Sequence, residues 1–286
     1  MNVAAKLGAF GLALGVVFAG AYGVGALAGP AAERGPESHE AAGADHGGGS
    51  EAASAPGGLA VSADGYTLRL AGAAPAAGTP GELSFQVLDG HGTAVTRFQT
   101  NHEKQLHLIV VRRDLTGFAH LHPVMSPDGT WRIPATLPAA GDWRLFADFL
   151  PEGRDRPVIL GLDVPVRGDY RPRPLPAPPT TATVDGYTVT VDGHLAAGRT
   201  SRLTLSVARH GVPVTDLQPY LGAYGHLVAL RVGDLAYLHV HPQETEKAGP
   251  EITFDVEVPT AGGYRLFLDF QHGGMVRTAS FTSEAS

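Results

Sequence analysis

The feature that most constrains this chain is an internal repeat. Residues 138–149 read PAAGDWRLFADF, and residues 259–270 read PTAGGYRLFLDF, 121 positions later. A shorter pair, His-Leu-His-Pro at 120–123 and His-Val-His-Pro at 239–242, lies 119 positions apart. Shifts of this size in the offset are what small loop insertions produce. A unit this long exceeds the repeats of solenoid proteins and fits two tandem domains.

The repeat sets the domain organisation. We expect one module at 59–170 and a second at 181–286, joined by a proline-rich linker at 171–180. Segment 29–58 is rich in Gly, Ala, Ser, Pro and Glu, a composition typical of a disordered tether.

Short alternating segments inside each copy predict β-strands. Residues 66–70 (YTLRL) and 187–191 (YTVTV) alternate between apolar and polar side chains, as do 83–87 and 203–207. Glycine (38 residues) and proline (22 residues) are too frequent for a helical bundle and supply turns. We predict an all-β fold class, with two tandem immunoglobulin-like (cupredoxin-like) antiparallel sandwiches of about seven strands each.

An apolar N-terminal segment precedes both modules. Residues 7–28 carry no charge, and 22 residues of helix reach about 33 Å, enough to cross a bilayer. Region 1–28 is therefore a transmembrane anchor or, because Ala26-Leu27-Ala28 resembles a cleavage site, a signal peptide. The first reading gives a single-pass cell-membrane protein with an extracytoplasmic C-terminal region, and the second gives a secreted protein.

Composition excludes several classes of function. The chain has no cysteine, which removes disulfides, thiolate metal sites and cysteine nucleophiles. Its net charge of −7 provides no basic surface for nucleic acid. No Gly-x-Ser-x-Gly, phosphate-binding or dinucleotide motif occurs, so we expect a protein that is not an enzyme. The sequence identifies no protein partner.

Histidines gather on a predicted hairpin in the first copy. His120 and His122 are two residues apart and therefore point to the same face of a strand. A four-residue loop at 114–117 would place Ile109 opposite His122, so that His107 projects from that face too. The three imidazoles then converge on one point. A loop of three or five residues would send His107 to the other face.

The second copy repeats the pattern with His226, His239 and His241. Three imidazoles suit Cu(II) or Zn(II), and we predict one such ion per copy. A fourth ligand could come from Asp148 or Asp269 on the closing strand of each copy. The second copy also offers His272, and the first offers His102 instead. The predicted function is sequestration or delivery of copper or zinc by an exported, membrane-tethered protein.

Two other interpretations stay open. In one, the histidines are structural, bonded to Asp148 and Asp269, and the protein is a metal-free interaction module of the cell envelope. In the other, a metal with an open coordination position hydrolyses a substrate, which requires a nearby base that the sequence does not supply.

The doubled hairpin also carries a family resemblance. The motifs Ala-His-Leu-His-Pro and Leu-His-Val-His-Pro, each followed by Arg-Leu-Phe-x-Asp-Phe, resemble YtkA-like domains of bacterial envelope proteins and, more remotely, periplasmic copper carriers of the copper-resistance type. The resemblance covers residues 60–286. It implies an immunoglobulin-like fold and copper handling outside the membrane, although a Met-rich stretch typical of such carriers is missing.

Overall fold

Every regular element in the described part of the chain is a β-strand. The computed structural model describes residues 56–178, 180–238, 240–243 and 247–286, and for His241 the backbone alone. These residues form twenty strands. Within them, no helix has the length and apolar character needed to cross a bilayer. The anchor or signal predicted at 1–28, and most of the predicted tether at 29–58, lie outside the described residues.

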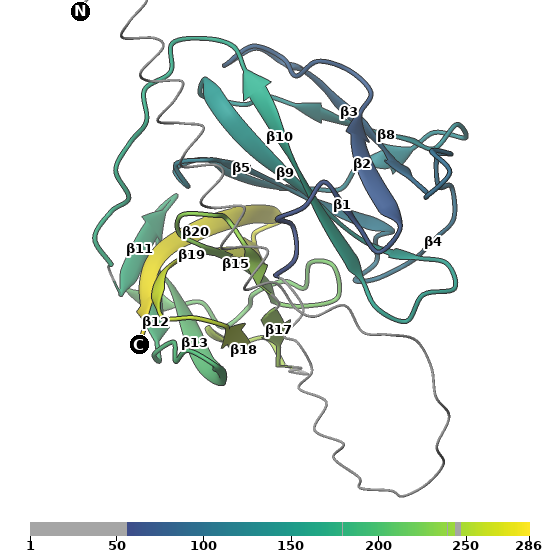
Figure 1. The fold of residues 1–286 in the computed structure, drawn as a ribbon. Coiled ribbons are helices and arrows are strands. Elements are labelled where there is room, and N and C mark those ends of the chain that lie inside the picture. Colours follow the sequence, from purple (N-terminus) through teal and green to yellow (C-terminus); the bar gives the residue numbers. More distant parts are fainter. Residues whose placement is uncertain (1–55, 179, 239, 244–246) are drawn as a thin grey trace, which may run out of the picture. The chain divides into compact units, whose positions relative to one another are not determined.

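The first sandwich consists of two antiparallel sheets (Figure 1). One sheet has the order β1-β2-β3-β8-β7, with strands Ser62–Ala63, Tyr66–Leu70, Gly81–Leu88, Thr130–Ala135 and Val124–Met125. The other has the order β10-β9-β5-β6, with strands Val158–Val166, Gly141–Pro151, Leu106–Arg112 and Phe118–Leu121. The short strand β4, Phe98–Gln99, pairs with β9.

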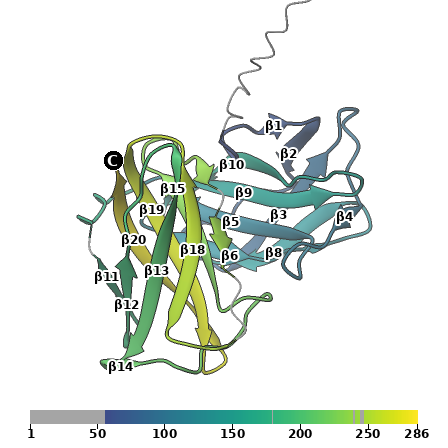
Figure 2. The same ribbon diagram turned by 90° about the horizontal axis from the view of Figure 1, so that it is seen from below.

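The second sandwich repeats this plan, and Figure 2 shows its long strands running together. One sheet has the order β11-β12-β13-β18-β17, with strands Thr181–Val184, Tyr187–Asp192, Arg199–Arg209, Glu251–Val258 and Val240–Pro242. The other has the order β16-β15-β19-β20, with strands Tyr237–Leu238, Gly225–Arg231, Gly262–His272 and Met275–Ala285. The short strand β14, Val212–Pro213, pairs with β13.

The strand order identifies the fold type. In the first sandwich, β2-β3-β8-β7 follows the A-B-E-D order of an immunoglobulin sheet, and β10-β9-β5-β6 follows the order G-F-C-C′. The second sandwich has the same two orders. The predicted fold class, two tandem all-β immunoglobulin-like sandwiches, is therefore confirmed.

Burial along the strands explains why two layers form. Strand β18 alternates strictly between inward and outward positions, so only one of its faces is covered. Each sandwich encloses its own apolar core, one around Phe85 and Trp131, the other around Phe254 and Phe281. Strand β5 differs, because all seven of its residues are buried. A strand buried on both faces must have a second neighbour outside its own sandwich.

That neighbour is the corresponding sheet of the second sandwich. The residues from 53 to 286 belong to one compact unit. A third apolar cluster within it combines side chains of both sandwiches: Ile109, Val111, Leu115 and Phe146 with Val228, Leu230, Leu235 and Phe267. Phe118 stacks on Phe267 with ring centroids 4.1 Å apart, and Phe146 packs on Tyr237 at 5.5 Å. Equivalent positions of the two copies thus meet across the contact.

Candidate metal centre

The histidine hairpin of the first copy forms as predicted in outline, with its register shifted by two residues. Ile109 lies opposite His120, and the loop spans 113–116 because the Arg112 amide bonds the Gly117 carbonyl. The prediction had placed Ile109 opposite His122. Side chains alternate with a period of two, so an even shift leaves every side chain on its predicted face. The three histidines therefore still converge.

Three ring nitrogens face one another at the end of this hairpin. His107 Nδ1 lies 3.1 Å from His120 Nε2 and 3.2 Å from His122 Nε2. The three ligand atoms all lie within 4.8 Å of one another. Ligands of one ion with metal–nitrogen bonds near ~2.0–2.1 Å are spaced roughly 3–4 Å apart. His107, His120 and His122, here called the histidine trio, form the one group in the described residues with this arrangement.

The outward nitrogen of each ring already has a protein partner. His107 Nε2 lies 3.0 Å from the carbonyl oxygen of Asn101. His120 Nδ1 lies 2.9 Å from Asp269 Oδ2, and His122 Nδ1 lies 3.4 Å from the Tyr220 hydroxyl. Carbonyl and carboxylate partners at the far nitrogen are the usual second shell of metal-bound histidine. The carbonyl and the carboxylate fix the tautomers of neutral His107 and His120 and the direction in which these two rings point.

These partners determine where the ring protons lie. A carbonyl oxygen only accepts, so the neutral His107 ring donates from Nε2 and presents a lone pair at Nδ1. When His120 is neutral, it donates from Nδ1 to the Asp269 carboxylate and presents a lone pair at Nε2. With all three rings neutral, His122 has one proton to give to His107. The contact between His107 and His120 then brings two lone pairs face to face, and a cation between them removes that repulsion.

Burial keeps His107 and His122 neutral. Desolvation, reinforced by the neighbouring His120, lowers the pKa of His107 to about 4. The same two causes, with a further contribution from His107, lower the pKa of His122 to about 3. Neutral imidazole is the form that binds a metal, so near pH 7 these two rings do not need to lose a proton before binding.

A small cavity of about 90 Å³ adjoins the histidine trio. Asp148, predicted as a ligand, lines it and lies opposite His107 on the neighbouring strand. Asp148 is half-buried, and desolvation raises its pKa to about 6. His102 also lines the cavity, with its ring centroid 6.3 Å from that of His107. Asp148 does not belong to the group of converging ligand atoms.

The second copy does not reproduce this arrangement among the residues described. His239 lies outside the described residues, and only the backbone of His241 is described. That backbone pairs with Asp255 in the sheet of β18, whereas His226 lies on β15 in the other sheet. In the second copy, pairing with β15 ends at Leu238, and Val240 already pairs with a strand of the other sheet. In the first copy, pairing with β5 continues to Leu121, two positions further along the repeat. The expectation of one ribbon carrying all three histidines therefore does not apply to this copy.

The remaining predicted ligands of the second copy have other neighbours. His272 lies between the Tyr187 hydroxyl at 2.6 Å and Asp216 at 3.1 Å. Asp269 binds His120 of the first copy. His226 lines the cavity beside the histidine trio, with its ring centroid 6.1 Å from that of His120. Asp269 and His226, both predicted as ligands of a second site, thus lie beside the histidine trio.

Sequence reasoning missed the carbonyl acceptors that orient the histidines. His102 and Glu103 have positive φ angles of 45° and 62°, which forms a tight turn and aims the Asn101 carbonyl at His107. The second copy has the same turn, and there the Tyr220 carbonyl accepts a bond of 2.7 Å from His226 Nε2. The signal was available, because each acceptor precedes its histidine by six residues in both copies.

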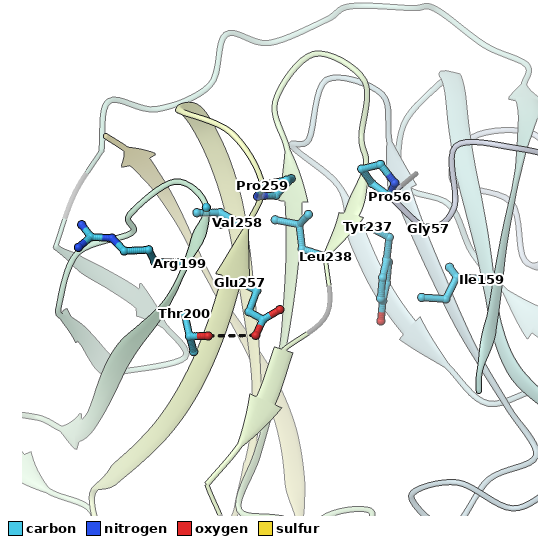
Figure 3. Close-up of a pocket in the computed structure, with 11 residues that line it drawn as sticks. Pro56, Gly57, Ile159, Arg199, Thr200, Tyr237, Leu238, Glu257, Val258 and Pro259 are labelled. Atoms are coloured by element: carbon cyan, nitrogen blue, oxygen red, sulfur yellow. Dashed lines mark hydrogen bonds between the residues drawn. The ribbon is translucent and has the colours of Figure 1, made fainter. Parts of the chain in front are cut away.

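A larger groove of about 460 Å³ lies elsewhere, lined by Ile159, Tyr237 and Leu238 (Figure 3). Its polar side chains Thr200 and Glu257 hydrogen-bond to each other at 3.0 Å. It holds no histidine and no set of converging ligands among the described residues. Within the described residues, converging ligand atoms therefore occur at the histidine trio and not in this groove.

Comparison with protein families gives one match. Residues 61–165 and residues 182–286 each match the family model described as "Domain of unknown function (DUF8832)". This is not the YtkA-like or the copper-resistance family that the hairpin motifs resemble, so the copper handling implied by that resemblance has no support from the match. No curated protein matches the chain.

Solved structures with similar folds include bacterial surface proteins. FdeC, an Escherichia coli adhesin, shares 15% identity with a TM-score of 0.25, covering 79% of this chain and 66% of its own. Invasin, a bacterial integrin-binding protein, shares 14% with a TM-score of 0.22, covering 76% and 39%. Domains 4 and 5 of the S-layer protein SbsC share 10% with a TM-score of 0.25, covering 77% and 96%. This chain thus spans less than two thirds of the first two, and similarity this low carries no argument about function.

Proposed function

We propose that this chain, which belongs to the DUF8832 family and carries two tandem copies of its domain, binds one divalent transition-metal ion. The ligand atoms would be His107 Nδ1, His120 Nε2 and His122 Nε2. The ion is Cu(II) or Zn(II), because imidazole nitrogen suits both. The three nitrogens would hold the ion, which would supply a Lewis acid at this place.

One observation carries the proposal. Two inward nitrogens, from His120 and His122, lie 3.1 and 3.2 Å from His107 Nδ1, while a protein group faces the outward nitrogen of each of the three rings. The Asn101 carbonyl leaves Nδ1 of a neutral His107 as an acceptor, and a neutral His120 bonded to the Asp269 carboxylate also turns a lone pair inward. The arrangement favours a cation at the centre.

The biological role that we propose is metal sequestration or delivery outside the cytoplasm. The apolar segment at 7–28 supports export, either as an anchor in the cell membrane or as a signal peptide. The resemblance of the hairpin motifs to copper-handling envelope domains points in the same direction. For the second copy, binding of an ion by His226, His239 and His241 with Asp269 or His272 remains a prediction.

A metal-free interaction module is the second proposal. It is favoured by the bond between Asp269 and His120, which joins the two sandwiches without an ion. In that case the histidine trio serves to hold the sandwiches together, and chelators leave stability unchanged. That the protein is not an enzyme stays a prediction.

Metal titration of purified protein tests the first proposal. Equilibrium dialysis at pH 7.5 against Zn(II) and Cu(II) should give one tight site per chain in the wild type, and His122→Ala should weaken it by at least 100-fold. His91→Ala removes an exposed turn histidine and serves as the matched control, with unchanged affinity. Binding that is equally weak in all three proteins would refute a metal role for the trio.

A further inference from the structure

Asp269 of the second sandwich is built into the histidine trio of the first. It lies on β19 with 3% of its surface exposed. Its Oδ2 accepts a bond of 2.9 Å from His120 Nδ1, and its Oδ1 accepts a bond of 2.5 Å from the Thr278 hydroxyl. Both oxygens are therefore engaged, and the carboxylate is fixed relative to the His120 ring.

This contact has a chemical consequence for the ligand. A carboxylate at Nδ1 holds the proton on that nitrogen and directs the Nε2 lone pair toward His107. It also makes the ring a stronger donor to a metal, as carboxylate–histidine pairs do in known sites. The residue that determines how His120 binds an ion thus comes from a different sandwich than His120 itself.

Other groups of the second sandwich lie at the same place. The Tyr220 hydroxyl lies 3.4 Å from His122 Nδ1. The Tyr220 carbonyl orients His226, whose ring lies 5.9 Å from His102 and 6.1 Å from His120 between centroids. The apolar cluster that includes Phe118 and Phe267 fixes these groups in position.

We propose that the second sandwich supplies the outer shell of the metal site of the first, with Asp269 as its principal positioning residue, so that ion binding and docking of the two sandwiches are thermodynamically coupled. The inference rests on the proposed metal function of the histidine trio. By linkage, an ion that binds the docked arrangement more tightly must stabilise that arrangement by the same factor.

Affinity measurements on the full chain test the positioning role. Asp269→Asn should weaken Zn(II) binding by about 10–100-fold, the usual effect of losing a second-shell partner. Asp216→Asn is the matched control, because it alters an aspartate–histidine pair of the same sandwich that does not touch the trio. It should change the affinity less than twofold.

A spectroscopic readout separates positioning from general destabilisation. At saturating Co(II), the visible absorption bands of Asp269→Asn should shift from those of the wild type, because His120 has become a weaker donor. Thr278→Val keeps the carboxylate and frees only Oδ1. It should show a smaller shift in the same direction, and it tests the idea even if Asp269→Asn folds poorly.

Thermal unfolding tests the coupling. Both tryptophans, Trp131 and Trp143, lie in the first sandwich, so their fluorescence follows that sandwich alone, whereas far-UV circular dichroism follows both. With Zn(II), the two transitions should coincide in the wild type and separate in Asp269→Asn.

The outcomes are distinguishable. If the wild type binds no ion at the trio, the proposed function itself fails. If the wild type binds, His122→Ala abolishes binding, and Asp269→Asn behaves as the wild type in affinity, spectrum and unfolding, the metal function survives and the outer-shell inference is overturned.

Discussion

The stacked pair Phe118 and Phe267 gives the sharpest test of how the two sandwiches meet. The rings lie parallel to within 10° at 4.1 Å, and Phe267 is 3% exposed. Replacing either ring with leucine keeps most of the apolar burial and removes the stack, so each single variant should cost about 1 kcal/mol. An aromatic pair contributes about 0.5–1.5 kcal/mol beyond area burial, and the double variant should therefore show a coupling of about 1 kcal/mol.

Urea denaturation of the wild type, both single variants and the double variant measures this coupling. The matched control pairs Phe118→Leu with Phe281→Leu, since Phe281 is 1% exposed and belongs to the core of the second sandwich alone. Separated residues are additive to within about 0.5 kcal/mol. A coupling between Phe118 and Phe267 no larger than that of the control pair would show that these faces do not pack together in solution.

Three further predictions follow from the site and its supports. Zn(II) at about 100 times its Kd should stabilise the protein by about 2.7 kcal/mol and raise Tm by roughly 5–10 °C in calorimetry, an effect that His122→Ala removes. Without metal, the lowered pKa values of His107 (about 4) and His122 (about 3) mean that the unfolded state binds more protons below pH 6.5. The free energy of unfolding should therefore be highest above pH 6.5 and fall as the pH drops towards 4. The raised pKa of Asp148 acts in the opposite direction and offsets part of this loss, and urea midpoints that do not fall between pH 7.5 and 5 would contradict the assignment. A Cβ at Gly161 would lie 1.9 Å from the Gly58 carbonyl oxygen, so Gly161→Ala should cost roughly 1–3 kcal/mol by thermal melting, whereas Gly249→Ala, in open space, should change little.

The fold was predictable because its determinants are local. Alternation at 66–70 and 187–191, frequent turn residues and the repeat were sufficient to identify two sandwiches. The convergence of the trio was predictable for a narrower reason. The loop after Arg112 has four residues, as assumed, and its start differs by one position, which shifts the register by two and preserves the face.

The packing between the sandwiches was not predictable from these signals, because period-two alternation describes only one sheet against its partner. One signal was present in the sequence. The stretches LHLIVVR at 106–112 and GHLVALR at 225–231 are nearly continuous in apolar residues, whereas strands such as 187–191 alternate, and β5 is indeed buried on both faces. Without that contact, Asp269 could be assigned only to its own copy.

Sequence equivalence between the copies also fails to give geometric equivalence. His120 and His239 occupy matching positions, yet the strand that follows leaves the sheet two residues earlier in the second copy. Nothing in the motif His-x-His-Pro encodes that exit, which depends on how Val240 pairs with Val256 in the opposite sheet. A motif repeated in sequence thus predicts the residue types at a site and leaves its assembly open.

The way the copies meet explains why duplication need not produce two identical sites. Because equivalent sheets face each other, each sandwich offers its histidine and aspartate to the same central region: His107 with Asp148 from one, His226 with Asp269 from the other. The first copy keeps the converging trio, and the second supplies the carboxylate that orients His120. The proposed centre of the first copy is therefore composite, and its affinity depends on residues of the second sandwich that never touch the ion.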